Sequence, residues 1–137
     1  MFVGGMPSVG RWRLLSDSGV KRVVWLLSET PPDVWLAETE SLLWLPIPDL
    51  HAPSVRQLEV GCAFLDAARR DRVSVLICCG AGAGRAPTVY IAWWLSKDGG
   101  SLEEGINAIK RVRPLADPTP AQRELLRQWH EQVLVRH

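Results

Sequence analysis

Three short, almost continuous runs of apolar residues stand out along the chain, each bounded by turn residues. They span Arg22–Leu27, Leu42–Ile47 and Val73–Cys79, and a shorter run at Phe2–Gly4 precedes them. Val, Ile, Leu and Trp dominate these runs, which is typical of β-strands. Because polar residues do not alternate with the apolar ones, we expect strands covered on both faces, as in a parallel sheet, with Phe2–Gly4 at its edge.

Helical periodicity occupies the segments between these runs. Over Ser54–Arg70, apolar residues recur every three or four positions, and Ser54 with Gln57 forms a capping-box pattern at the start. Further helices are predicted at Gly10–Ser16, Asp33–Glu40, Ala86–Lys97, Ser101–Arg111 and from Thr119 onward, with Gly99 and Gly100 as the end signal of the helix from Ala86. This alternation predicts an α/β fold, a single domain over 1–137 whose central, mostly parallel sheet of four to five strands is flanked by helices.

Composition and charge restrict the classes of partner. The chain has 137 residues, 47% hydrophobic and 23% charged, with a net charge of +1, which suits one globular domain and does not favour nucleic acid or an anionic membrane. We expect no transmembrane helix and no signal peptide, because the apolar stretches are short and the N-terminus lacks the required pattern. The three cysteines lack the spacing of a zinc site or a disulfide framework. We therefore expect a cytoplasmic monomer without metal or cofactor.

A glycine-rich loop, CCGAGAGRAPT at 78–88, lies between the strand Val73–Cys79 and the helix that follows it. Three glycines within five residues allow the backbone to turn successive N–H groups toward one point, and such a nest at a helix N-terminus binds phosphate. Arg85 adds a planar fork that matches two phosphate oxygens. The residues predicted to bind phosphate are Gly80, Ala81, Gly82, Ala83, Gly84 and Arg85.

Cys79 stands at the junction of strand and loop, which makes it the candidate nucleophile. The loop N–H groups and Arg85 favour the thiolate, so we expect Cys79 to be ionised near neutral pH. A thiolate beneath a bound phosphoryl group is placed for in-line attack on phosphorus and a covalent intermediate. This chemistry needs no metal, because Arg85 and the amides meet the equatorial oxygens. The alternative is a buried, unreactive Cys79, since free cysteines are commonly core residues.

Cleavage of a phosphate ester also requires an acid that protonates the leaving oxygen. Asp49 fits this role because it follows the strand Leu42–Ile47 at its carboxyl end, on the same side of the sheet as the glycine loop. A purely structural role in a Pro-Asp turn is the alternative for Asp49. Asp117, in the sequence ADPTP, is the second candidate acid.

Cys79, Gly82 and Arg85 together resemble the CxxGxxR signature of the cysteine-dependent protein tyrosine phosphatase superfamily. The rest of the chain resembles the small dual-specificity type: GGMPS at 4–8 and GVKRVVWL at 19–26 resemble its opening, PIPDLHAPS at 46–54 its acid loop, and RVRPLADPTPAQRELL at 111–126 its closing segment. The resemblance implies a metal-independent phosphomonoesterase acting through a cysteinyl-phosphate. It implies phosphotyrosine in proteins or peptides as the substrate, with phosphoserine and phosphothreonine as further candidates.

The resemblance also bears on the remaining polar residues. It implies that Asp49 is the acid and that Gln122 is an accessory residue which positions water, although Gln122 also fits a capping box with Thr119. Asp117 resembles the Asp-Pro acid of low-molecular-weight tyrosine phosphatases, whose loop cysteine follows the first strand. Because about 75 residues precede Cys79 here, we expect Asp117 in a turn.

Two residues depart from the family pattern. Cys78 replaces a histidine that braces the loop, and Ala86 replaces a Ser or Thr whose hydroxyl stabilises the departing thiolate. Loss of one hydrogen bond to a charged group costs about 1.5–3 kcal/mol, or about ten- to a hundredfold in the breakdown of the phospho-enzyme. A weakly active or inactive phosphate-binding protein is therefore an alternative. A phosphatase of a small molecule or an RNA 5′ end and a rhodanese-like sulfur transferase are the others.

Overall fold

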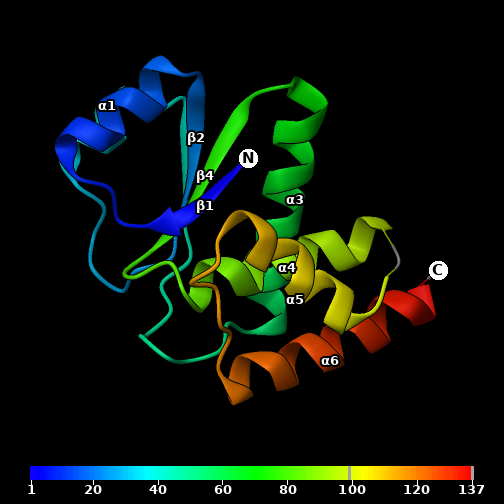
Figure 1. The fold of residues 1–137 in the computed structure, drawn as a ribbon. Helices are drawn as coiled ribbons and strands as arrows, with labels where there is room; N and C mark the ends of the chain where they lie inside the picture. Colours follow the sequence, from blue (N-terminus) through cyan, green and yellow to red (C-terminus); the bar gives the residue numbers. More distant parts are fainter. Residues whose placement is uncertain (99, 137) are drawn as a thin grey trace.

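The computed structural model of the chain describes residues 1–98 and 100–136, in which strands and helices alternate (Figure 1). The elements are β1 (Phe2–Gly5), α1 (Val9–Asp17), β2 (Val20–Trp25), α2 (Asp33–Glu38), β3 (Ser41–Trp44), α3 (Val55–Asp71), β4 (Ser74–Cys79), α4 (Arg85–Asp98), α5 (Leu102–Val112) and α6 (Pro120–Arg136). The predicted alternation is confirmed. The helix-end signal predicted at Gly99 lies outside the described residues.

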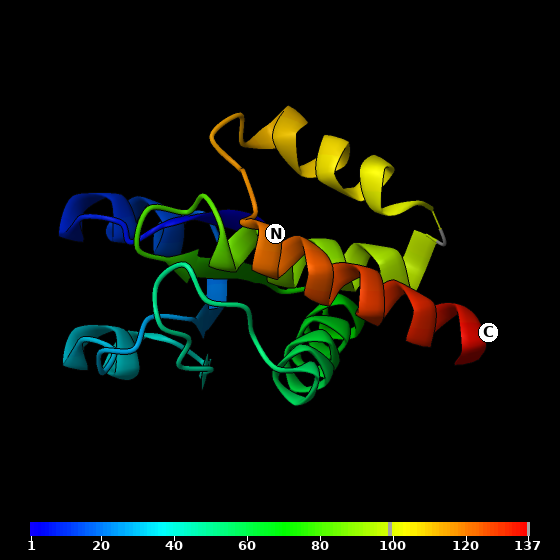
Figure 2. The same ribbon diagram turned by 90° about the horizontal axis from the view of Figure 1, so that it is seen from below.

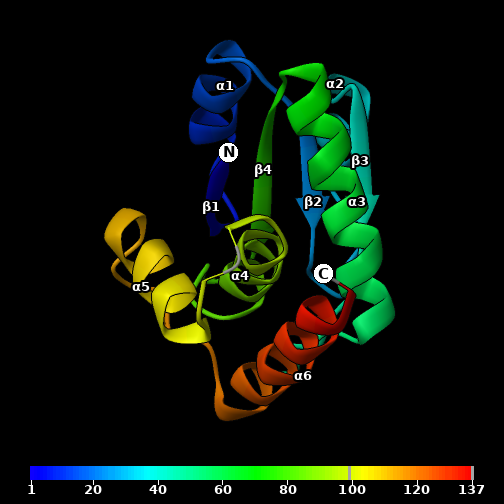
Figure 3. The same cartoon turned by 90° about the vertical axis from the view of Figure 1, so that its right-hand side faces the viewer.

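The strands form one parallel sheet in the order β1-β4-β2-β3, seen from left to right in Figure 3. In this register Gly5 of β1 lies beside Cys79 of β4, and Trp25 of β2 lies beside Cys78. The predicted α/β class, the mostly parallel sheet of four to five strands and the edge position of the first strand are confirmed; the sheet of the described residues has four strands, and all their pairings are parallel. Because all the carboxyl ends lie at one edge, the segments that follow β1, β3 and β4 meet there.

Helices cover both faces of the sheet, as the continuous apolar runs predict. On one face, Trp12 of α1 and Trp35 of α2 stack with their ring centroids 4.7 Å apart and pack against β2 and β4. On the other face, α3, α4, α5 and α6 pack against β2 and β4 in the larger core cluster. Alternation along β4 places Cys78 on the first face and Cys79 on the second. None of the described helices is both long and apolar enough to cross a bilayer.

The predicted helix starts are well formed, whereas one predicted strand ends early. The capping boxes Ser54–Gln57 and Ser101–Glu104 are both present. β3 ends at Trp44, although the apolar run continues to Ile47. Pro46 carries no N–H group and interrupts the ladder at that point. The chain from residue 45 onward is therefore an irregular segment that leads from β3 to α3 past the edge where the glycine loop lies.

Candidate active site

The glycine loop, residues 80–84, connects the carboxyl end of β4 to the first residue of α4, Arg85. Seen from below in Figure 2, the loop (green), the segment after β3 (teal) and the start of α6 (orange) lie next to one another. Together these three segments line a cavity of about 170 Å³. The sheet topology thus brings together three segments that are spread over residues 49–122 of the sequence.

All five carbonyl groups of residues 80–84 accept hydrogen bonds from donors outside the loop. The donors are Met6 N for Gly80 (3.1 Å), Arg113 Nη2 for Ala81 (2.7 Å), Arg113 Nε for Gly82 (2.6 Å), Asp117 N for Ala83 (2.7 Å), and Thr88 N and Oγ1 for Gly84 (2.9 and 2.7 Å). In a planar trans peptide the C=O and the following N–H point in opposite directions. The N–H groups of residues 81–85 therefore point away from these donors. This is the orientation that an anion-binding nest requires.

Close packing of β1 against the loop depends on glycine. Gly82 has φ +73°, and a Cβ at this position would collide with the backbone of Gly4 and Gly5. A Cβ on Gly5 would lie 2.7 Å from the carbonyl oxygen of Gly80. The pair of glycines at the end of β1 and the glycine in the loop thus permit one close backbone approach.

Cys79 lies at the floor of the cavity. Its side chain is 1% exposed, it lines the cavity, and its Sγ accepts a hydrogen bond from Ala86 N at 3.4 Å. Its sulfur thus meets the first turn of α4, and Arg85, the first residue of that helix, lines the same cavity.

Arg85 is held in place from the segment that follows β3. The residue is 7% exposed; Nη1 donates to the carbonyl oxygen of Ile47 at 2.7 Å, and Nη2 lies 3.5 Å from Asp49 Oδ1. A buried guanidinium fixed at one nitrogen retains further N–H groups for an oxyanion in the cavity.

Two aspartates lie on the rim of this cavity rather than one. Asp49 is 79% exposed at its side chain and accepts a hydrogen bond from the N–H of Leu50, which has φ 68°. Asp117 was expected in a turn; it lies in the connection between α5 and α6 and lines the same cavity. Its carboxylate is 3.0 Å from Arg123 Nη2. The structure therefore brings both candidate acids to the site, with different partners.

Gln122 is fully buried, and both ends of its amide are bonded. Oε1 accepts from Thr119 N at 2.9 Å while Gln122 N donates to Thr119 Oγ1 at 3.2 Å, so the predicted capping box is present. Nε2 donates to the carbonyl oxygen of His51 at 3.0 Å. A Cβ on Gly84 would lie 2.7 Å from Gln122 Oε1. Gln122 thus contacts the glycine loop, the acid segment and the start of α6.

Arg113 is the residue of this site that the sequence analysis missed. Its two hydrogen bonds to the loop carbonyls orient the peptide groups of residues 81–83. The available signal was weak: an arginine directly before Pro114, just beyond the end of α5, is free of the helix and can direct its side chain elsewhere.

The two departures from the family pattern lie on opposite faces of the sheet. Cys78 packs among the tryptophans of α1 and α2, and burial, with a smaller contribution from Cys79, raises the pKa of its thiol to about 12. Ala86 is fully buried and offers only its backbone N–H to Cys79. The hydroxyl of Thr88 donates to the carbonyl oxygen of Gly84. It therefore does not replace the Ser or Thr hydroxyl that the family pattern has at position 86.

No group of three or more His, Cys, Asp or Glu side chains within residues 1–98 and 100–136 is placed to hold a metal ion. The groups that face the cavity are a thiol, backbone amides, a guanidinium and carboxylates. Such a set can bind a tetrahedral oxyanion, attack it and exchange protons with it.

The parallel sheet with a thiol under a glycine loop and a buried arginine is the arrangement expected of the cysteine-dependent protein tyrosine phosphatase superfamily. Residues 1–132 match the family "Dual specificity phosphatase, catalytic domain", and the chain belongs to that family.

Individual relatives agree with this membership. The chain is 30% identical over 119 residues to mouse "Dual specificity phosphatase 28", covering 86% of this chain and 72% of that protein. It is 26% identical over 133 residues to Arabidopsis thaliana "Protein-tyrosine-phosphatase IBR5", covering 97% of this chain but only 49% of that protein. The solved structure of "Tk-PTP in the active form" superposes with a TM-score of 0.86 and 32% identity, covering 93% of this chain and 89% of that one. The chain thus spans about half of the plant relative.

Proposed function

We propose that the chain is a single catalytic domain that hydrolyses phosphate monoesters, without a metal, through a covalent phosphate on Cys79. The proposal places phosphotyrosine in proteins first among its substrates, with phosphoserine and phosphothreonine as further substrates. The observation that carries the proposal is that all five carbonyl groups of residues 80–84 accept hydrogen bonds from donors outside the loop. The N–H groups of the loop therefore point toward the place where a phosphoryl group would lie. Membership of the dual specificity phosphatase family supports the same activity.

In the first step Cys79 Sγ attacks phosphorus, the bond from phosphorus to the ester oxygen breaks, and Asp49 gives its proton to that oxygen. In the second step a water molecule attacks phosphorus and loses a proton to Asp49. The bond from sulfur to phosphorus then breaks, which releases inorganic phosphate and restores the thiolate. Arg85 and the loop amides hold the equatorial oxygens in both steps.

The ion pair between Arg85 and Asp49 has a role before the first step. Because Asp49 is mostly exposed and its Oδ1 lies 3.5 Å from Arg85 Nη2, the pair is weak, worth about 0–1 kcal/mol. A phosphate dianion brings two oxygens to the guanidinium and replaces the carboxylate there. Asp49 is then available beside the ester oxygen.

The size of the cavity favours a terminal phosphate on a side chain. A volume of about 170 Å³ is smaller than the ~300–1,000 Å³ of pockets that enclose drug-sized ligands. Such a cavity receives a phosphoryl group and leaves the rest of the substrate outside. Short phosphorylated side chains can therefore reach the thiolate as well as phosphotyrosine.

The test is hydrolysis of p-nitrophenyl phosphate and of phosphopeptides by the wild type and by Cys79→Ser, with EDTA and vanadate as additions. We expect wild-type turnover that EDTA leaves unchanged and vanadate abolishes, and none in Cys79→Ser. Equal background rates from both proteins would instead identify a phosphate-binding protein without activity. A persulfide on Cys79 after thiosulfate, with no trapped phospho-enzyme, would identify a sulfur transferase.

The choice between the two acids is tested with a series of aryl phosphates whose leaving groups differ in pKa. We expect Asp49→Asn to slow the esters of poor leaving groups far more than those of good ones, because only the former need a proton in the transition state. Asp117→Asn, on the same rim, is the matched control and should leave this dependence unchanged. The reverse pattern would assign the acid to Asp117.

A further inference from the structure

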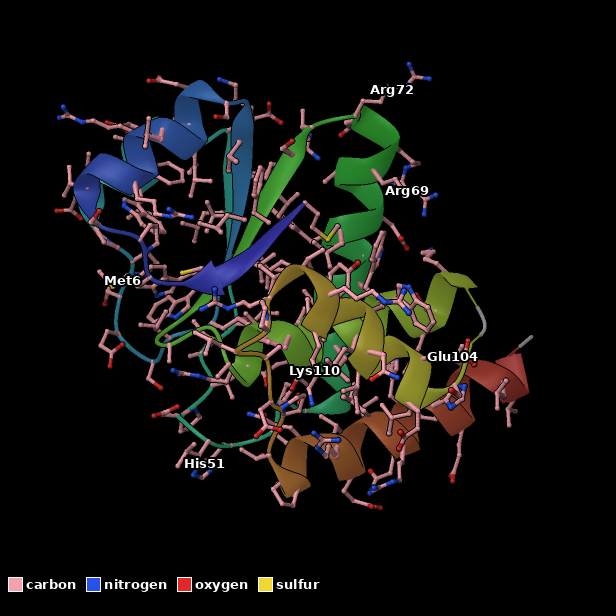
Figure 4. All side chains as sticks on the ribbon, viewed as in Figure 1. Met6, His51, Arg69, Arg72, Glu104 and Lys110 are labelled. Atoms are coloured by element: carbon pink, nitrogen blue, oxygen red, sulfur yellow. The ribbon has the colours of Figure 1, made fainter. Side chains whose placement is uncertain are left out.

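A second cavity lies on the other side of the glycine loop from the catalytic one. It has a volume of about 440 Å³ and is lined by β1, the residues between β1 and α1, the first turn of α1, and Gly80 and Ala81 of the loop. Ala81 lines both cavities, so the loop is the wall between them. In Figure 4, Met6 marks the side of the second cavity and His51 marks the acid segment, with the loop between them.

The charges of this second cavity are all positive. Arg11 and Arg113 line it, and no acidic residue does. Within the described part of the chain neither of these arginines forms an ion pair. Arg113 donates hydrogen bonds from Nε and Nη2 to carbonyl oxygens. Because these oxygens carry no net charge, they do not neutralise the charge of the guanidinium group.

The carboxylates of the catalytic cavity, by contrast, are paired with cations. Asp49 Oδ1 lies 3.5 Å from Arg85 Nη2, and Asp117 Oδ1 lies 3.0 Å from Arg123 Nη2. The positive charge of the second cavity is not compensated in this way. It therefore attracts an anionic group that lies beside the phosphorylated residue of a bound substrate.

We propose that the cavity lined by Arg11 and Arg113, here called the Arg11 cavity, binds an acidic side chain of the substrate next to the phosphorylated residue. The proposal rests on the proposed phosphatase function and adds its specificity. The apolar floor, which includes Phe2, Leu15 and Leu76, suits the aliphatic stem of such a side chain, while the guanidinium groups bind its anionic end. A carboxylate and a second phosphate share this chemistry.

The experiment uses phosphotyrosyl peptides of identical composition in which one glutamate is moved through positions −3 to +3. We expect kcat/KM to peak at one position and to exceed the peptide with glutamine there by about fivefold, as for an exposed charge pair. A matching peptide with a second phosphoserine at that position separates phosphate from carboxylate as the preferred anion.

Variants at Arg11 assign the preference to the cavity. Arg11→Ala should abolish it, and Arg11→Glu should reverse it in favour of lysine at the same position. Arg13→Ala is the matched control, because Arg13 is exposed on the same helix but does not line the cavity, and it should keep the preference. All three variants should hydrolyse p-nitrophenyl phosphate like the wild type, since this ester has no flanking group.

The outcomes are distinguishable. No dependence on the position of the glutamate, or a dependence that survives in Arg11→Ala, would overturn the Arg11 cavity while p-nitrophenyl phosphate turnover still upholds the phosphatase. Absence of turnover with p-nitrophenyl phosphate in the wild type would overturn the phosphatase and this inference with it. A preference that weakens from low to high salt would add support, because the partner charges are exposed.

Discussion

Arg113 should be essential to the shape of the phosphate-binding loop. In Arg113→Met both hydrogen bonds to the carbonyls of Ala81 and Gly82, at 2.7 and 2.6 Å, are lost. A hydrogen bond from a charged donor contributes about 1.5–3 kcal/mol; with the more exposed bond to Ala81 discounted, the pair is worth about 2–3 kcal/mol. The melting temperature should fall by roughly 6–12 °C for a domain of this size.

Function should suffer through the orientation of the amides rather than through any lost contact with the reacting atoms. A bound oxyanion itself helps to orient the loop amides, so we take half of the ~2–3 kcal/mol as lost from binding. A loss of ~1.4 kcal/mol in binding free energy is a tenfold loss of affinity. We therefore expect the inhibition constant of vanadate to rise about tenfold or more in Arg113→Met, and less in Arg113→Lys, which keeps the charge and one donor. Arg111→Met, an exposed arginine near the end of the same helix, is the control. Unchanged vanadate inhibition in a folded Arg113→Met protein would refute this role.

Four further predictions concern the loop and the cysteines. Gly82→Ala forces a methyl group to φ +73° against Gly5, so thermal melting should show a less stable protein and calorimetry should show no vanadate binding; wild-type affinity would contradict the close approach. Ala86→Ser adds a hydroxyl beside the N–H that donates to Cys79, so the steady-state rate on an aryl phosphate should rise about tenfold and the pre-steady-state burst should shrink, and an unchanged burst would refute this. Burial raises the pKa of the Cys62 and Cys78 thiols to about 12, so iodoacetate near neutral pH should label Cys79 alone by peptide mass spectrometry, with protection by vanadate, whereas equal labelling of Cys62 would contradict it. The same two thiols ionise in the unfolded chain from about pH 9 but stay protonated when folded, so denaturant melts should show the free energy of unfolding falling between about pH 9 and pH 12.

The class of the fold could be predicted because β4 is apolar on both faces. Its residues alternate between two core clusters, and an unbroken apolar run is what such a strand requires. The end of β3 could not be predicted from the same signal. Leu45 and Ile47 remain buried and still donate backbone hydrogen bonds to Trp25 and Leu26, so the apolar pattern runs past the strand.

The site was predictable as far as it is contiguous in the sequence. Cys79 and Arg85 share one loop, so their proximity follows from their spacing. Arg113 and Asp117 reach the loop from about thirty residues away, through backbone carbonyls of Gly82 and Ala83. Every residue has a backbone carbonyl group, so the amino-acid sequence does not indicate which carbonyl accepts a hydrogen bond from a distant side chain. Contacts of this kind therefore become visible only in the folded chain.

The acid segment is fixed at two points by side chains of the phosphate site itself. Arg85 Nη1 binds the carbonyl of Ile47 and Gln122 Nε2 binds the carbonyl of His51, so Asp49 stands within a five-residue stretch anchored at both ends. Within this stretch Leu50 has φ 68°, a conformation that costs a residue with a side chain about 1–2 kcal/mol and persists only where the surroundings impose it. The two anchors supply that constraint. Because Arg85 is also the residue that would bind phosphate, and Gln122 also packs against Gly84, the distance from the acid to the phosphate loop is set by shared side chains. In the proposed mechanism Asp49 therefore needs only to leave Arg85 and does not travel with a closing loop, as in a preorganised centre.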